Sequence, residues 1–168
     1  MAISAPSNTA PAAVVDILAS LLESTVNSIF RFMEEGSPYL SRATAEVRRP
    51  LQEMVVSNHR RAAELAAMLE ALGAPTTVMA SPQVNEQYLA FLSLKFLLPK
   101  LVGEKQLCLK HYENALSGIA KLPQVPPEVR QLLTTHRDEQ KRELAALEHA
   151  AAHVAGKNGS NQTVQPPK

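Results

Sequence analysis

The chain contains four long stretches in which apolar residues recur with the period of an amphipathic α-helix. They cover residues 11–35, 41–72, 86–119 and 127–155. Short connections join the first two stretches and the last two, whereas residues 74–85, between the second and the third, have no helical period. Short connections return a helix antiparallel, and about a dozen extended residues span about 40 Å, roughly the length of a 25-residue helix. The pattern predicts one all-α bundle of two antiparallel hairpins, with the second and third helices parallel.

Proline and glycine mark the expected ends of these helices. Gly73 should follow the second helix, Pro127 should open the fourth, and Gly156 should end it. Pro50 is expected to kink the second helix or to mark its effective start, and Pro99 to kink the third. The flanking residues 1–10 and 156–168 are polar and are expected to be disordered, which leaves 11–155 as the bundle domain.

Composition limits the classes of partner and compartment. The 168 residues are 45% hydrophobic, enough for a single core. The 17 basic and 16 acidic side chains give a formal charge of +1, so no overall field favours nucleic acid or an anionic membrane. The single Cys108 cannot form an internal disulfide, and no secretory signal pattern opens the sequence. We expect a cytoplasmic protein that binds neither nucleic acid nor membranes.

Three segments carry a resemblance to a known group of proteins. Residues 58–65 and 68–75 are similar to a Glu-x-x-His motif followed by a leucine-rich stretch, and residues 104–116 to a third helix with a glutamate and a tyrosine. Residues 126–130, which lead into Leu144 and Leu147, are similar to the entry of a fourth helix. In this order the segments resemble the ferritin-like superfamily, in particular its small bacterial members of rubrerythrin-like or uncharacterised type. The likeness spans residues 12–155 and implies a ferritin-like four-helix bundle.

The resemblance also shows which metal ligands are missing. The Glu-x-x-His positions of the second helix fall on Asn58 and Arg61. The corresponding pair of the fourth helix falls on Arg137 and Gln140 or on Asp138 and Lys141, according to the register chosen. The first helix offers Thr25 on its apolar stripe and Glu23 only at its edge. Of the family's ligands, only Glu104 of the third helix is retained.

A di-iron centre needs about four carboxylates and two imidazoles from four helices. Arg61 would instead place a fixed charge in the bundle, with Glu104 as its expected partner and Asn58 and Tyr112 as further hydrogen-bonding groups. We therefore expect a non-enzymatic structural, binding or interaction protein without a cofactor. The binding residues that we expect are Asn58, Arg61, Glu104, Tyr112, Gln140 and Lys141. The alternative is an iron- or manganese-binding oxidase, iron-handling or stress-response protein that uses Glu104 with His59, His111 and His136.

Three smaller patterns carry alternatives. Cys108 and His111 lie on neighbouring rows of one helix and could form a nucleophilic or metal-binding pair, although we favour a core role for Cys108. His149 and His153, four residues apart, could hold a surface divalent metal ion. We instead expect them to stabilise the C-terminal end of the fourth helix through its dipole. Apolar residues in the proline-flanked halves of the second and third helices predict a homodimer: Val55, Val56, Phe91 and Phe96.

Overall fold

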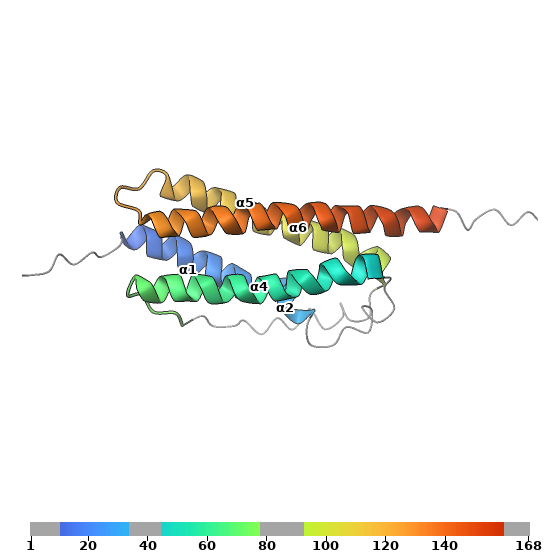
Figure 1. The fold of residues 1–168 in the computed structure, drawn as a ribbon, viewed down its shortest axis with the longest axis horizontal. Helices are drawn as coiled ribbons and strands as arrows, with labels where there is room; N and C mark the ends of the chain where they lie inside the picture. The colour runs from blue at the N-terminus through green and yellow to red at the C-terminus, as the bar shows by residue number, and fades with distance from the viewer. Residues whose placement is uncertain (1–10, 34–44, 78–92, 160–168) are drawn as a thin grey trace, which may run out of the picture.

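The computed structural model describes residues 11–33, 45–77 and 93–159, and these residues are mostly helical with no strand among them. The helices are α1 (Ala12–Val26), α2 (Ile29–Phe32), α4 (Ala45–Ala71), α5 (Leu94–Ile119) and α6 (Pro127–Gly159). The predicted all-α class is confirmed. The four long helices lie side by side along one axis, with the short α2 beside α4 (Figure 1). None of the described helices is long and apolar enough to cross a membrane.

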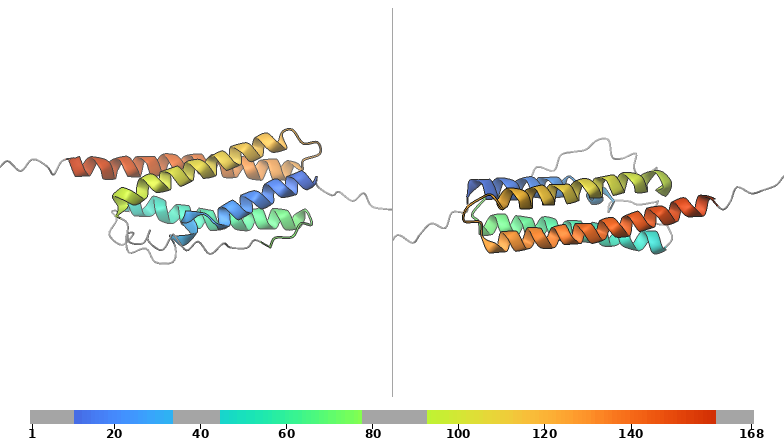
Figure 2. Two further views of the ribbon diagram at one scale, coloured as in Figure 1. Left: turned by 180° about the vertical axis from the view of Figure 1, so that it is seen from behind. Right: turned by 90° about the horizontal axis from the view of Figure 1, so that it is seen from above.

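The long helices alternate in direction around the bundle. α1 and α6 run one way, and α4 and α5 run the other (Figures 1 and 2). The main packed pairs of long helices are α1 with α4, α4 with α6, α6 with α5 and α5 with α1, so every helix packs between two antiparallel neighbours. In antiparallel packing, the dipoles of neighbouring helices point in opposite directions, so the positive end of one helix lies beside the negative end of the next. α4 and α5 stand at opposite corners and are parallel, the arrangement that the connection lengths predict.

Two apolar clusters form the core, one toward each end of the bundle. The first joins α2, the first half of α4, the first half of α5 and the second half of α6: Ile29, Phe30, Met33, Val47, Leu51, Met54, Val55, Leu97, Leu98, Leu101, Leu147 and Ala150. The second joins α1 to the other ends of α4, α5 and α6: Val14, Leu18, Leu21, Leu22, Leu65, Leu69, Tyr112, Ala115, Ile119, Val129 and Leu133. The buried positions between the two clusters are largely polar, and this middle layer holds the candidate site.

The first helix is shorter than the periodicity predicts. α1 ends at Val26, and Asn27 and Ser28 leave the helix before α2 begins at Ile29. The Ser28 Oγ accepts a hydrogen bond from the backbone N–H of Phe30 at 3.3 Å, which caps α2. The predicted continuous helix to Glu35 is therefore wrong, because asparagine and serine offer the backbone local hydrogen bonds that compete with the helix. Residues 34 and 35 lie outside the described residues.

The ends of α5 and α6 also differ from the prediction. Ser93 has an extended backbone (φ −70°, ψ 155°), so α5 begins at Leu94 and no helix runs unbroken from Glu86. Residues 86–92 lie outside the described residues, as do 1–10 and 160–168, for which disorder was expected. α6 does begin at Pro127, as predicted, but it continues past Gly156 to Gly159. Glycine weakens a helix without necessarily ending it, so Gly156 was a poor stop signal.

Proline and glycine act differently in α4. Pro50 is the sixth residue of the helix, so it does not mark the start. Gly73 follows the last turn with φ +74°, a conformation that favours glycine. The Gly73 N–H donates to the Glu70 carbonyl and the Ala74 N–H to the Leu69 carbonyl, both at 2.9 Å. These two bonds form a Schellman motif, so the predicted stop at Gly73 is confirmed.

Candidate functional site

The middle layer of the bundle gathers buried polar side chains from all four long helices. They are Thr25 of α1, Asn58 and Arg61 of α4, Lys105 of α5, and His136 and Gln140 of α6. Each would carry a desolvation cost there unless it were hydrogen-bonded or paired. Their contacts therefore determine what the site can do.

Arg61 forms the central contact of this layer. Its side chain is fully buried, and its Nη1 and Nη2 donate to Oε1 and Oε2 of Glu143 at 2.8 and 2.9 Å. This two-point geometry matches the planar guanidinium to the planar carboxylate. Nη1 also lies 3.4 Å from Oε2 of Glu139, one turn earlier on α6. Arg61 thus joins α4 to α6 through charge-assisted hydrogen bonds.

Lys105 brings a second cation to the same carboxylate. Its Nζ donates to Oε2 of Glu143 at 2.7 Å and lies 4.1 Å from the centroid of the Phe30 ring, a cation–π contact. Burial lowers the pKa of Lys105, and the neighbouring Glu143 opposes that shift. Burial also acts against ionisation of Glu143, but the hydrogen bonds and charges of Arg61 and Lys105 hold its pKa below the usual value. Glu143 is the carboxylate shared by both buried cations.

The network continues from this centre to the surface between α4 and α6. Arg60 donates through Nη2 to Glu139 at 2.6 Å and through Nη1 to Glu64 at 3.0 Å. Both contacts are partly exposed, so solvent screens them and each contributes little to stability. Arg60 and Glu139 therefore act mainly as a polar rim that shields the buried Arg61 from one side.

His136 links three helices and joins the same network through Glu64, which also accepts from Arg60. Its Nε2 lies 2.6 Å from Oε2 of Glu64 on α4, and its Nδ1 lies 3.2 Å from the Tyr112 hydroxyl on α5. Burial lowers the pKa of His136, against the opposing effect of Glu64. A neutral imidazole that donates from Nε2 to Glu64 and accepts at Nδ1 from Tyr112 satisfies both contacts. Burial raises the pKa of Tyr112 to about 12, so the phenol stays protonated and can donate.

Asn58 and Gln140 differ in how well their amides are satisfied. The Asn58 Nδ2 donates to the Thr25 carbonyl at 3.2 Å, and the Thr25 hydroxyl donates to the Leu21 carbonyl at 2.7 Å. The first bond ties α4 to α1 near the end of α1, and the second lies within α1. Within the described parts of the chain, the buried Gln140 Oε1 has no hydrogen-bonding partner, and the same is true of the Arg61 Nε. Such unpaired buried groups are costly.

The structure corrects the predicted partner of Arg61. Among the described residues, the carboxylates that pair with Arg61 are Glu139 and Glu143, so the expected pairing with Glu104 is wrong. Glu104 is only half-buried, and the neighbouring position, Lys105, faces the core. Because one residue turns a helix by about 100°, this shift by one position replaces an anion with a cation in the site.

On α6, the residue that binds Arg61 through both carboxylate oxygens is Glu143, which belongs to neither pair predicted for the fourth helix. Gln140 of the first predicted pair is buried three residues before it. In the other register, Asp138 pairs with its neighbour Arg137 at 2.8 Å. The Lys141 side chain is 52% exposed, and its Nζ lies 3.8 Å from the Glu113 Oε1 at the surface. Of the predicted binding residues, Asn58, Arg61, Tyr112 and Gln140 lie in the buried layer, and Glu104 and Lys141 do not.

The residues of the alternative metal site are not brought together. His59 is exposed on α4, while His136 is fully buried on α6 and already bonded to Glu64 and Tyr112. His111 accepts or donates at Nδ1 with the Ser24 hydroxyl at 3.0 Å. In the described parts of the chain, no three histidine, cysteine, aspartate or glutamate side chains form a group that could hold a metal ion.

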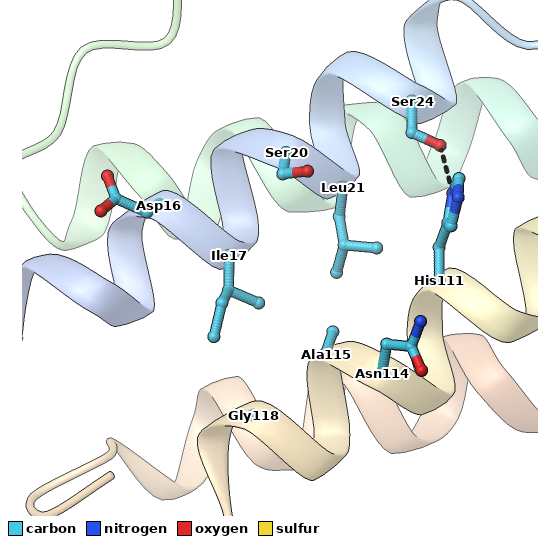
Figure 3. A pocket seen from close by; sticks show the side chains of 9 residues that line it. All are labelled: Asp16, Ile17, Ser20, Leu21, Ser24, His111, Asn114, Ala115 and Gly118. Atoms are coloured by element: carbon cyan, nitrogen blue, oxygen red, sulfur yellow. Dashed lines mark hydrogen bonds between the residues drawn. The ribbon is translucent and has the colours of Figure 1, made fainter. Parts of the chain in front are cut away.

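His111 and Ser24 close one end of a groove between α1 and α5 (Figure 3). The groove has a volume of about 450 Å³, with Leu21 and Ala115 among its apolar walls and Ser20 and Asn114 among its polar ones. Cys108 does not line this groove, and burial raises the pKa of its thiol. A raised thiol pKa disfavours the thiolate, so the nucleophilic Cys108–His111 pair gains no support.

Comparisons with known proteins give no further assignment. The chain matches no protein-family model, no curated protein and no solved structure. A proposal for its function therefore depends on the geometry of the middle layer.

Proposed function

We propose that this protein is a metal-independent, ferritin-like helical scaffold with a non-enzymatic structural, binding or interaction role. The observation that carries the proposal is the pairing of two buried cations, Arg61 and Lys105, with the single carboxylate of Glu143. These side chains lie in the layer where the resemblance implies a di-iron centre, and they join three of the four helices without metal.

The set of donors in this layer does not fit a pair of iron ions. Such a centre takes a glutamate from each of two helices and a Glu-x-x-His pair from each of the other two. The middle layer instead holds Arg61 and Lys105 on the carboxylate of Glu143, together with the neutral side chains of Thr25, Asn58 and Gln140. The buried imidazole of this layer, His136, is already bonded to Glu64 and Tyr112. The Glu143 carboxylate is also already occupied by hydrogen bonds from Arg61 and Lys105, so it is not free to bind a metal ion. This chemistry supports a bundle whose charged network takes over the structural role of a metal centre.

The helix directions support the ferritin-like part of the proposal. α4 and α5 run in the same direction, and all neighbouring pairs are antiparallel (Figure 1). An up-down-up-down bundle would place its second and third helices antiparallel, whereas ferritin-like folds use one long crossover. The connection lengths in the sequence and the helix directions agree with a bundle that has one long crossover between its second and third long helices.

The test is the metal content and metal response of the untagged protein. We expect neither iron nor manganese after purification from medium that contains both, and an unchanged free energy of unfolding after treatment with a chelator. About two irons or manganese ions per chain, released by the chelator with a loss of stability, would contradict the proposal and favour the oxidase or iron-handling alternative.

Self-association is a second part of the proposal. Val56 of α4 and Phe96 of α5 are 69% and 68% exposed. Val55, by contrast, is buried in the first apolar cluster and cannot serve an interface, and Phe91 lies outside the described residues. We expect a homodimer that uses Val56 or Phe96. Sedimentation velocity at high micromolar concentration should show the dimer, and Val56→Ser or Phe96→Ser should weaken it.

A further inference from the structure

The second half of α6 carries two exposed histidines, His149 and His153. An interaction with the helix dipole would require both to lie near the end of the helix, because this effect falls off within the last turn. α6 continues to Gly159, however, so His149 lies ten residues before the end and His153 lies six. The dipole interpretation that the sequence favoured therefore does not account for the pair.

The two imidazoles share one face of α6. Residues four apart in a helix lie one above the other, with Cα atoms about 6 Å apart along the axis. The neighbouring positions on this face are small and exposed: Ala145, Ala146, Ala152 and Gly156. Ala150, in contrast, faces the first apolar cluster and anchors this part of α6 on the bundle. The histidine pair is thus exposed on a packed helix.

We propose that His149 and His153 form a surface site for a borderline divalent metal ion, Cu²⁺ or Zn²⁺, with water in the remaining coordination positions. Imidazole nitrogen suits copper and zinc, whereas magnesium and calcium prefer oxygen ligands. In the His-Glu-x-x-His motif, two histidines at this spacing on one helical face bind zinc together with a third protein ligand. Residues 149–153 have the spacing of these two histidines, with alanines between them. The ion would bridge one turn of α6 and hold that turn helical.

The site is independent of the proposed function. It lies on the outer face of α6 and shares no residue with the network of Arg61, Lys105 and Glu143. It also selects a different class of metal from the iron and manganese of the oxidase alternative. Failure of one proposal therefore leaves the other standing.

The experiment is calorimetric titration of the full, untagged chain with Zn²⁺, with Cu²⁺ electron paramagnetic resonance as a second readout. We expect saturable binding at no more than one ion per chain, nitrogen hyperfine structure from two imidazoles, and no binding of Mg²⁺. Replacement of His149 or His153 by Ala should weaken binding by at least about ten-fold. His59→Ala, which removes an exposed histidine of α4, is the matched control and should bind as the wild type does.

Circular dichroism keeps the test independent of folding, since both histidines are exposed and their replacement should leave the helical content unchanged. The proposal is overturned if Zn²⁺ binding does not saturate, or if folded His149→Ala and His153→Ala bind with wild-type affinity. It is also overturned if His59→Ala removes the binding.

Discussion

Arg61 of α4 and Glu143 of α6 form a two-point ion pair, with nitrogen–oxygen distances of 2.8 and 2.9 Å, and the arginine side chain is fully buried. Lys105 of α5 donates to the same carboxylate at 2.7 Å. Transfer of these charges from water is costly, and this cost offsets much of their mutual attraction. We therefore expect the network to fix the geometry of the bundle more than it raises the free energy of unfolding. The three side chains fix the relative positions of α4, α5 and α6, and this geometric role can be tested by mutation.

The first prediction concerns an apolar replacement of the whole triad. We expect the triple variant Arg61→Met, Lys105→Met, Glu143→Leu to unfold with a free energy within about 1 kcal/mol of the wild type, or higher, because it removes the desolvation cost together with the attraction. Urea denaturation measures this value. A loss as large as that of a single charge deletion would mean that the network contributes a large net stabilisation.

The second prediction concerns pH. Burial lowers the pKa of His136 in the folded protein, whereas the unfolded chain binds a proton near the ordinary value of about 6.5. The unfolded state therefore takes up more protons as the pH falls below about 6.5, and stability should decrease in that window. The difference in unfolding free energy between the wild type and His136→Gln should change with pH below about 6.5 and be constant above about pH 7.5. A flat difference across the whole range would show that His136 is not held neutral.

Tyr112 gives a prediction at alkaline pH. Its pKa is raised to about 12 by burial, so the folded state keeps the phenolic proton while the unfolded state loses it near pH 10. Stability should therefore fall as the pH rises above about 10. A spectrophotometric titration of the wild type minus that of Tyr112→Phe isolates this residue and should show a midpoint near 12. A midpoint near 10 would place the hydroxyl in solvent.

A matched pair of amides tests the hydrogen-bond assignments. The Asn58 side chain donates to the Thr25 carbonyl, whereas the buried Gln140 Oε1 finds no partner among the residues that the structure describes. We expect Asn58→Leu to cost about 1 kcal/mol, because it removes a buried hydrogen bond and leaves the Thr25 carbonyl with only the 3.3 Å bond from the Ser28 N–H. Gln140→Leu should be close to neutral, because it removes an unsatisfied acceptor. Thermal denaturation of both variants gives the comparison, and the reverse order would contradict the assignments.

The sequence predicted the burial of Arg61 correctly because its position follows the apolar period of α4 from Leu51 to Leu69. It did not predict the partner. Lys105 also lies on the buried period of α5, four residues after Leu101 and seven before Tyr112. The resemblance to a third helix with a glutamate instead indicated the neighbouring Glu104, whose carboxylate could pair with Arg61. The pattern along α5 therefore held the signal, and the expectation from the resemblance concealed it.

Glu143 could not have been identified from α6 alone. Gln140 and Glu143 have the same spacing as Asn58 and Arg61, but so do Arg137 and Gln140 one turn earlier. Periodicity fixes which face of a helix is buried, whereas the axial offset between two helices depends on how their side chains pack. The same limit applies at Asn27 and Ser28, where local hydrogen bonds end a helix that the apolar period would continue.

The central claim is that Glu143 holds two buried cations, and the most direct test is the unfolding free energy of Glu143→Gln compared with that of Glu104→Gln. The first change leaves Arg61 and Lys105 without their shared counter-ion and should cost about 3 to 5 kcal/mol, as the breaking of buried pairs does. The second removes a half-buried carboxylate that does not pair with Arg61 and should cost less than about 1 kcal/mol. Equal losses, or a larger loss for Glu104→Gln, would contradict this account of the bundle centre.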